Sequence, residues 1–159
     1  MKHCRSKDTK LSRNDTKVMR KAMNIVYHNL EKTEETEYIR FQLEWKFNGA
    51  NVPIVFERIN LILKDDSGKV CGGLLANHYW NCIFLDILWL DEDYRRQGFG
   101  EKLMHKLEDI AREKGVTLIH LDTHEFQAPS FYEKLGYEVF GVLQDSPFGY
   151  KRYYMKKEL

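Results

Sequence analysis

The feature that most constrains the fold is an apolar run from Ile83 to Leu90, followed directly by a glycine-containing turn and an amphipathic helix. Because apolar side chains occupy consecutive positions in the run, we expect a strand that is buried on both faces, near the centre of a sheet. A second short apolar strand is expected from Thr117 to Asp122, after Gly115 ends the helix. This strand–helix–strand order predicts a right-handed parallel crossover. The buried face of the helix is formed by Leu103, Leu107, Ile110 and Ala111.

The segments before this unit predict a helix and a hairpin. Apolar residues recur at helical spacing from Val18 to Leu30, so a helix is expected there, with Asn14 or Asp15 as its N-cap and an end near Lys32. The segment 38–47 fits helix and strand patterns equally, and turn residues predict a loop from Asn48 to Pro53. Two strand-like runs, 59–63 and 70–76, flank Asp65-Asp66-Ser67-Gly68 and predict an antiparallel hairpin.

The segments after the unit predict one short helix and two strands. Pro129 stands at the position that favours the first turn of a helix, and Gly136 ends that helix. Strands are expected at 137–143 and 150–155, around the turn residues 145–149. The predicted fold class is therefore mixed α/β (α+β): a single domain with a central, mostly antiparallel twisted sheet flanked by helices.

Composition limits the kinds of protein this chain can be. With 159 residues, 43% apolar content and a net charge of +1, it is expected to form one packed domain over residues 1–159, with no general attraction to nucleic acid or membranes. The chain has no signal peptide and no apolar run long enough to cross a membrane, so a cytoplasmic protein is expected. Cys4, Cys71 and Cys82 show no metal-binding spacing and predict reduced thiols without a bound metal.

The first seventeen residues hold a cluster of lysines and arginines. The simplest interpretation is a mobile, solvated basic tail over residues 1–13. Nucleic-acid binding through this tail is the alternative, and it predicts salt-sensitive binding that is lost when residues 1–17 are deleted.

The turn Arg95-Arg96-Gln97-Gly98-Phe99-Gly100 predicts an anion-binding site. Its backbone N–H groups and the start of the following helix can both face a phosphate. A Walker loop would end in Gly-Lys-Ser/Thr, and a dinucleotide fingerprint needs a third glycine where Leu103 stands, so both are excluded. The pattern Arg/Gln-x-x-Gly-x-Gly/Ala remains, as does a turn with a purely structural role.

A second segment gives the turn a more specific meaning. Ala128-Pro129-Ser130-Phe131-Tyr132-Glu133-Lys134-Leu135-Gly136-Tyr137 resembles the signature Ala-x-x-x-Tyr-x-x-x-Gly-Phe/Tyr. In this order and at this separation, the two segments resemble those of the GNAT superfamily of acetyl-CoA-dependent N-acetyltransferases. The resemblance covers roughly residues 61–157, and it implies a sheet that is splayed at the strand before the pyrophosphate turn.

The resemblance also implies where acetyl-CoA would bind. The pyrophosphate would lie on the N–H groups of Arg96 to Glu101, where Gly98 and Gly100 let the backbone approach closely. The rest of the cofactor would lie along a bulged strand, whose free N–H could also polarise the thioester carbonyl. Of the two arginines in the turn, one is expected to face solvent. The implied cofactor-binding residues are Leu88, Trp89, Leu90, Arg95, Arg96, Gln97, Gly98, Phe99, Gly100 and Glu101.

Two residues are candidates for catalysis. Tyr132 matches the tyrosine that protonates the departing CoA thiolate in the family and is the favoured catalytic candidate, with an aromatic residue of the core as the alternative. Asp86 is a carboxylate within an apolar run, so burial would make it a base or an anchor for the amine. The alternatives are that it pairs with a buried cation or that its strand exposes that face. A relay through His120, Asp122, His124 and Glu125 is the less favoured alternative, with His120 expected to be a hydrogen-bonded core residue.

One departure from the family pattern bears on the cofactor. Many relatives carry Asn three residues before the alanine, where it contacts the cofactor arm, and Glu125 stands there in this chain. That contact is therefore not carried over.

The acceptor is the least constrained part of the prediction. An aromatic pocket is expected from Trp80, Trp89, Phe148, Tyr150 and Tyr154, with Asp86 or Asp91 attracting a cationic amine. The predicted function is transfer of an acetyl group from acetyl-CoA to a primary amine of a small molecule or peptide, directly within a ternary complex. An acetyl-cysteine route is disfavoured, a non-catalytic acyl-CoA-binding module is the alternative, and a homodimer is left open.

Overall fold

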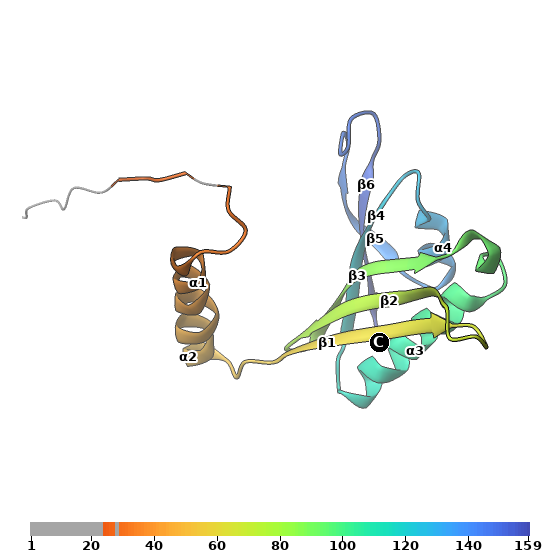
Figure 1. The fold of residues 1–159 in the computed structure, drawn as a ribbon, viewed down its shortest axis with the longest axis horizontal. Helices are drawn as coiled ribbons and strands as arrows, with labels where there is room; N and C mark the ends of the chain where they lie inside the picture. The colour runs from red at the N-terminus through yellow and green to blue at the C-terminus, as the bar shows by residue number, and fades with distance from the viewer. Residues whose placement is uncertain (1–23, 28) are drawn as a thin grey trace, which may run out of the picture. The chain divides into compact units, whose positions relative to one another are not determined.

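A six-stranded, mostly antiparallel sheet organises the computed structural model, which describes residues 24–27 and 29–159 (Figure 1). The strand order is β1-β2-β3-β4-β6-β5, and only β3 and β4 run parallel. The predicted fold class is confirmed, with β3 central as expected. The expectation that this strand is buried on both faces is wrong, because Ile87 and Trp89 are 47% and 51% exposed. The strands are β1 (Phe56–Lys64), β2 (Val70–Tyr79), β3 (Cys82–Leu90), β4 (Leu118–His124), β5 (Glu138–Leu143) and β6 (Arg152–Glu158).

Helix α3 (Phe99–Glu113) links the parallel strands β3 and β4, which confirms the predicted crossover. Met104, Leu107 and Ala111 of α3 are fully buried, and they belong to the core formed with Leu74 and Ile83 of the sheet. Burying a side chain of this size contributes about 1.5–3 kcal/mol, so this contact anchors the helix whose first turn forms the candidate anion site.

The predicted short elements around this unit are also confirmed. The hairpin β1–β2 turns where expected, and Asp65 stabilises the turn because its Oδ1 accepts hydrogen bonds from the N–H groups of Ser67 and Lys69, at 2.9 and 3.0 Å. Helix α4 (Pro129–Lys134) begins at Pro129. It is followed by Gly136, whose φ of +86° suits glycine.

The segment that fitted both helix and strand patterns is helical. It comprises α1 (Glu34–Phe41), the π-helical segment η1 (Gln42–Asn48) and α2 (Gly49–Asn51), and none of its residues is buried. The predicted loop from Asn48 to Pro53 is therefore wrong over its first four residues. The helix ends at Val52, which is extended because it precedes Pro53.

The predicted helix from Val18 to Leu30 is wrong where the structure describes it. Residues 24–27 and 29–33 contain no helix or strand, and Ile25, Val26 and Tyr27 are exposed. A short amphipathic helix needs a packed face to be stable, and these side chains have none. The start of that helix and the basic tail, residues 1–13, lie outside the described residues.

Cys71 and Cys82 are free thiols, and Cys4 lies outside the described residues. The described residues contain no helix long and apolar enough to cross a membrane. They also contain no group of three or more His, Cys, Asp and Glu side chains that could hold a metal ion.

Candidate functional site

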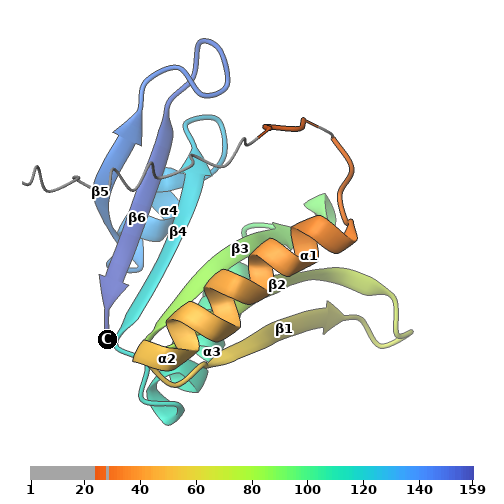
Figure 2. The ribbon, with the colours of Figure 1, turned by 90° about the vertical axis from the view of Figure 1, so that its left-hand side faces the viewer.

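The site begins where β3 and β4 separate. Their parallel pairing runs from Cys82 opposite Leu118 to Leu85 opposite Leu121 and then stops. Beyond that point β3 pairs only with β2, and β4 pairs only with β6. Figure 2 shows the two strands diverging from their common start. The edge of β3 from Asp86 to Leu90 that faces β4 therefore has no strand partner within the described residues. Apart from the Leu90 carbonyl, which accepts from Arg95, the backbone groups along this edge are available to a ligand.

A bulge in β3 marks the point of separation. Leu85 lies opposite Ala76 and Ile87 lies opposite Leu75, so Asp86 is the extra residue. A bulge bends its strand and leaves one residue unpaired, which turns the end of β3 away from β4. The bulge agrees with the one that the resemblance implied. It also exposes Asp86, so the premise that this carboxylate is buried among apolar side chains is wrong.

A cavity of about 600 Å³ fills the opening, a size usual for small-ligand sites. Successive side chains of a strand point to opposite faces, so the lining of the cavity includes side chains from both faces of the sheet. Leu88 and Leu90 lie on the face that α3 covers, and Ile87 and Trp89 lie on the other. The lining residues are Leu85 to Leu90 of β3, Arg95, Leu121 to His124 of β4, Phe126, Gln127, Ala128 and Tyr132.

The glycine turn presents a row of backbone N–H groups. The first backbone donor of α3 to bond back along the chain is Lys102, whose N–H reaches the carbonyl of Gly98 at 3.0 Å. Helix geometry leaves the N–H groups before it, from Gly98 to Glu101, without a partner inside the helix. Arg96 and Gly98 both have positive φ, +58° and +82°, and such a conformation can gather successive N–H groups around an anion.

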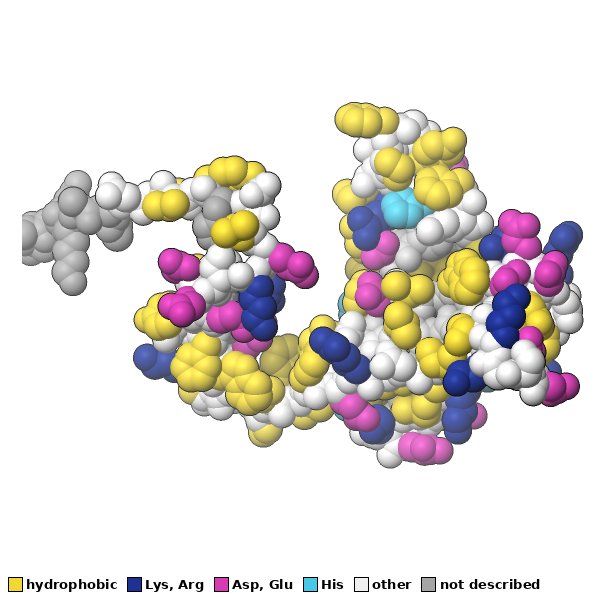
Figure 3. Space-filling model, in the orientation of Figure 1, with side chains coloured by type: hydrophobic (Ala, Val, Ile, Leu, Met, Phe, Trp, Pro, Cys, Tyr) yellow, Lys and Arg dark blue, Asp and Glu magenta, His cyan; other side chains and the backbone are white. Residues whose placement is uncertain are grey.

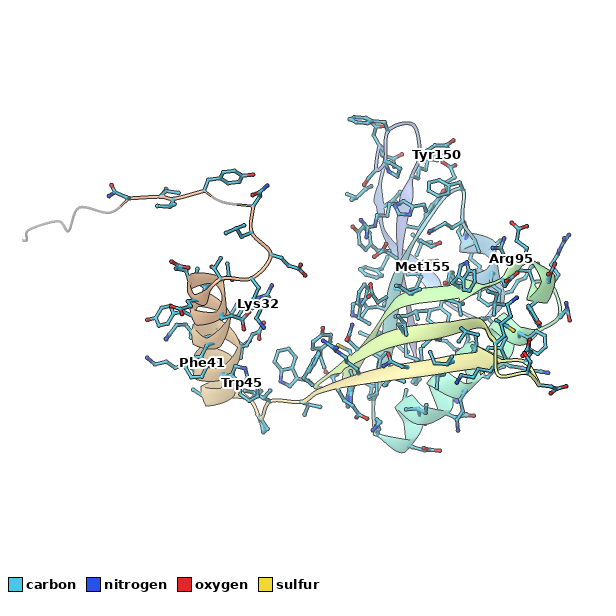
Figure 4. The ribbon with its side chains drawn as sticks, viewed as in Figure 1. Lys32, Phe41, Trp45, Arg95, Tyr150 and Met155 are labelled. Carbon is cyan, nitrogen blue, oxygen red and sulfur yellow. The ribbon has the colours of Figure 1, made fainter. Side chains whose placement is uncertain are left out.

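The side chains of the turn are held in different ways. The Arg95 Nε donates to the carbonyl of Leu90 at 2.9 Å, which fixes this arginine against the end of β3, where it lines the cavity. Figure 4 shows Arg95 at this end of the sheet. Both arginines are exposed, but only Arg95 lines the cavity. The Gln97 Nε2 donates to the carbonyl of Asp93 at 2.6 Å, which closes the turn.

Tyr132 enters the cavity from α4. Its side chain is 8% exposed and packs edge-on against Phe131 and Tyr137, with ring centroids 5.1 and 6.1 Å away. Burial and the nearby Asp122 carboxylate raise the pKa of Tyr132 to about 12. Its phenol therefore keeps its proton throughout the neutral pH range. Tyr132 belongs to the core cluster and also lines the cavity, so its position is compatible with the structural role and with the catalytic one.

A charged pair lies on the face of the sheet opposite α3. The Arg152 Nε and Nη2 both lie 2.7 Å from Oδ2 of Asp122, so this arginine and this carboxylate neutralise each other. His120 lies against Phe84, with ring centroids 5.1 Å apart, instead of in the core beneath α3. Burial lowers the pKa of His120, although Asp122 acts in the opposite direction. This histidine does not line the cavity.

Glu125 and Asp91 lie outside the cavity lining. The Glu125 N–H donates to the carbonyl of Lys151 at 2.9 Å, and its Oε2 accepts from the N–H of Lys151 at 3.3 Å. Asp91 accepts from the N–H of Asp93 at 3.3 Å. Both carboxylates therefore hold loops in place, which agrees with leaving Glu125 out of the cofactor contacts.

The aromatic residues expected at the acceptor site are not all brought together. Trp89 lines the cavity, whereas Trp80 lies in the turn after β2 and Tyr154 contacts Phe140. Sequence reasoning missed Phe126 and Gln127. An aromatic residue two positions after the end of a strand was the available signal for Phe126. Nothing in the sequence indicates that Gln127 faces the cavity.

Several known proteins are similar to this chain in sequence and in fold. The sequence profile of the acetyltransferase (GNAT) family matches residues 19–137. A blasticidin-S acetyltransferase of Streptomyces morookaense is 35% identical over 95 residues, which are 59% of this chain and 70% of that protein. The crystal structure of an acetyltransferase from Bacillus cereus superposes with a TM-score of 0.74 at 37% identity, covering 84% of this chain and 98% of that one.

A more distant structure shares the fold alone. It is an aminoglycoside 6′-N-acetyltransferase complexed with coenzyme A, with a TM-score of 0.58, 21% identity and coverage of 74% of this chain and 86% of that one. The match of the family profile spans most of the chain, including the splayed strands, the glycine turn and Tyr132. The chain belongs to the acetyltransferase (GNAT) family.

Proposed function

We propose that this protein transfers an acetyl group from acetyl-CoA to a primary amine of a small molecule, directly within a ternary complex. The observation that carries the proposal is the unpaired edge of β3, which ends at the glycine turn and faces Tyr132 across one cavity. An extended, amide-containing arm can bond to such an edge as a further strand would. The distant relative complexed with coenzyme A supports this choice of co-substrate.

The turn and β3 would divide the cofactor between them. The N–H groups from Arg96 to Glu101 would hold the pyrophosphate, with charge from Arg95 at the cavity side. The backbone of Leu88, Trp89 and Leu90 would bond the arm, and the N–H at the bulge would polarise the thioester carbonyl. The side chains of Gln97 and Phe99 would shape the loop instead of bonding the phosphate. Gln97 already bonds the carbonyl of Asp93, and the Phe99 side chain has no polar atom.

Tyr132 would act on the departing sulfur. A phenol with a pKa of about 12 holds its proton at neutral pH, so it can donate a hydrogen bond to the thiolate as charge develops. An ordinary thiol has a pKa of about 8.5, so complete transfer of the phenol proton to sulfur would be uphill. Tyr132 would therefore stabilise the leaving group chiefly as a hydrogen-bond donor.

The acceptor would enter from the face of the sheet opposite α3, beside Asp86. This carboxylate is exposed in the cavity and has no ion pair or side-chain hydrogen bond with the described residues. It is therefore free to attract the ammonium form of the amine and to take up its proton through water. The name of the blasticidin-S acetyltransferase relative supports a small-molecule acceptor.

Direct transfer fits the cysteines of the described chain. Cys71 is buried, and burial raises the pKa of the Cys82 thiol. Neither lines the cavity. A thiol that lies outside the cavity cannot reach a thioester held there, and the raised pKa of Cys82 further disfavours its thiolate, so an acetyl-cysteine intermediate is not expected.

Release of the CoA thiol from acetyl-CoA, measured across a panel of primary amines, tests the proposal. Tyr132→Phe should lower kcat by about 10²-fold, the usual scale for a lost proton donor. The matched control is Tyr137→Phe, since that neighbouring phenol is also buried and its hydroxyl has no hydrogen-bond partner among the described residues. It should leave kcat within about twofold.

The pH dependence adds a further check. Because Tyr132 stays protonated from pH 6 to 9, the ratio of wild-type to Tyr132→Phe rates should be constant over that range. Tight CoA binding with no turnover on any amine, unchanged by Tyr132→Phe, would instead identify a non-catalytic acyl-CoA-binding module.

A further inference from the structure

An aromatic wall stands beside the cavity and has no part in the proposed cofactor contacts. We define it as His124, Phe126 and Tyr150. The rings of His124 and Phe126 are stacked, 5.2 Å apart and 8° from parallel, and Tyr150 meets Phe126 edge-on at 5.0 Å. His124 and Phe126 line the cavity.

The aromatic wall is exposed although it is built from large rings. Phe126 is 56% exposed and Tyr150 is 47% exposed. Figure 3 shows hydrophobic side chains gathered at this end of the molecule, around the loop between β5 and β6, and Figure 4 places Tyr150 there. Exposed aromatic faces that adjoin a ligand cavity are typical of a binding surface for another planar group.

Hydrogen bonds hold the aromatic wall in place without a ligand. The Gln127 Oε1 accepts from the N–H of His124 at 2.8 Å and lies 3.2 Å from its Nδ1, which orients the imidazole. The segment that carries Tyr150 is closed by a bond from the N–H of Ser146 to the carbonyl of Tyr150 at 2.9 Å. It is tied to the end of β4 by the paired bonds between Glu125 and Lys151. A surface fixed in this way loses little freedom when a ligand binds.

Charge complements the ring surface across the same cavity. Asp86 stands on β3, on the opposite side of the opening from the aromatic wall. The other carboxylate of the lining, Asp122, is neutralised by Arg152. A ligand that spans the cavity would thus meet aromatic faces at one end and an unpaired negative charge at the other.

From this arrangement we infer that the aromatic wall is the acceptor subsite and that the acceptor is a primary amine joined by a short linker to a planar aromatic or heteroaromatic ring. The ring lies on Phe126 and Tyr150, and the ammonium group points toward Asp86 at the bulge, where the thioester would lie. This inference rests on the proposed function for its chemistry, but the ring preference can be measured apart from turnover.

Two amines that differ only in the ring test it. 2-Phenylethylamine and 2-cyclohexylethylamine have the same ethylamine chain and the same charge, but only the first has a planar aromatic ring. We expect kcat/KM to favour the phenyl compound by about tenfold, the scale of a good aromatic contact. Phe126→Leu and Tyr150→Leu should each reduce that preference to about twofold or less.

The matched control is Phe140→Leu. Phe140 is also 56% exposed, but it lies on β5 against Tyr154 and does not line the cavity. Its replacement should leave the preference unchanged. The thermal midpoint and CoA affinity of all three variants should match the wild type, which shows that the fold is intact.

Calorimetric titration of both amines into the CoA-bound protein separates the two proposals. Equal acetylation of the two amines, or a preference that survives Phe126→Leu, would overturn the subsite and leave the acetyltransferase proposal standing. No turnover with either amine, but binding of the phenyl compound that depends on Phe126, would support the subsite and count against the enzyme. Equal weak binding of both amines would overturn the subsite.

Discussion

At the scale of single residues, the two ends of α3 show how a similar backbone conformation can serve different purposes. Gly98 and Gly115 have φ values of +82° and +70°, and a Cβ added to either would meet no atom within 4 Å. Each glycine is needed for its backbone conformation and not for space. Only Gly98 lies in the candidate anion site, where its N–H is one of those left free at the start of the helix.

This pair gives a prediction. Gly98→Ala and Gly115→Ala should each lower the free energy of unfolding by roughly 1–2 kcal/mol, the cost of a left-handed conformation for a residue with a side chain. Only Gly98→Ala should weaken CoA binding, by about tenfold, because it disturbs the N–H groups that would hold the pyrophosphate. Urea denaturation and calorimetric titration with CoA measure the two effects. Equal CoA affinities in the two variants would contradict the proposed pyrophosphate site.

At the scale of elements, a buried ion pair connects α3, α4 and β6. Glu108 of α3 is 2% exposed, and its Oε1 lies 2.8 Å from Nζ of Lys157 on β6. The same Nζ donates to the carbonyl of Leu135, directly after α4, at 2.8 Å. Arg112 supplies a weaker contact to Glu108 at 3.4 Å. The lysine therefore helps fix the helix that carries Tyr132.

Lys157→Met should lower the free energy of unfolding by about 3 kcal/mol, because it leaves the buried Glu108 carboxylate without its nearest cation. Lys156 provides the control on the same strand. Its Nζ lies 3.3 Å from Glu138 and 3.1 Å from Glu158, and both of these carboxylates are exposed. Lys156→Met should cost less than about 1 kcal/mol. Similar losses in the two variants, measured by urea denaturation, would show that burial of the Lys157 pair has no special effect.

The elements also show what the sequence could and could not predict. The strands, the crossover and the glycine turn were predictable because apolar runs and turn residues mark them locally. The segment 38–47 was ambiguous because its aromatic residues suit strands while its spacing suits a helix, and only the structure decides for the helix. The exposure of Asp86 was one of several alternatives that the sequence left open, because its apolar neighbours suggest burial and a bulge leaves no local signal in such a run.

For the site, the sequence could indicate the cofactor side better than the acceptor side. The glycine turn and Tyr132 belong to contiguous motifs, so their chemistry could be read from spacing. The aromatic wall brings together the end of β4 and the loop before β6, which are distant in the chain. Its geometry depends on the bonds between Glu125 and Lys151, and residue types alone do not predict such contacts.

At the scale of the whole sheet, the cavity divides two groups of strands. β1 to β3 lie on one side and β4, β6 and β5 on the other, and they share only the short parallel pairing at the start of β3 and β4 (Figure 2). A ligand bonded to the edge of β3 would brace the open end of the sheet, where pairing between strands is missing. Binding of CoA should therefore make the open end of the sheet locally more rigid.

Hydrogen exchange measures that rigidity. Saturating CoA should slow amide exchange by about tenfold or more in the peptides that contain residues 87–90 and 96–101, because bound amides exchange only after local opening. Peptides from β1, residues 56–64, should exchange at an unchanged rate and serve as the internal control. Protection that appears elsewhere and spares residues 87–90 would contradict the proposed course of the cofactor arm.

The extra residue Asp86 determines which side chains at the end of β3 lie on the same face of the sheet. If Asp86 were paired in the ladder like its neighbours, regular alternation from Leu85 would place Ile87 and Trp89 on the face of α3, and Leu88 and Leu90 on the other face. Because the bulge takes one residue out of this alternation, deletion of Asp86 would make the pairing with β2 continuous and leave each later side chain on its present face. The side chains that β3 presents to the cavity therefore depend on which residue is left out of the pairing as much as on the identity of the residues.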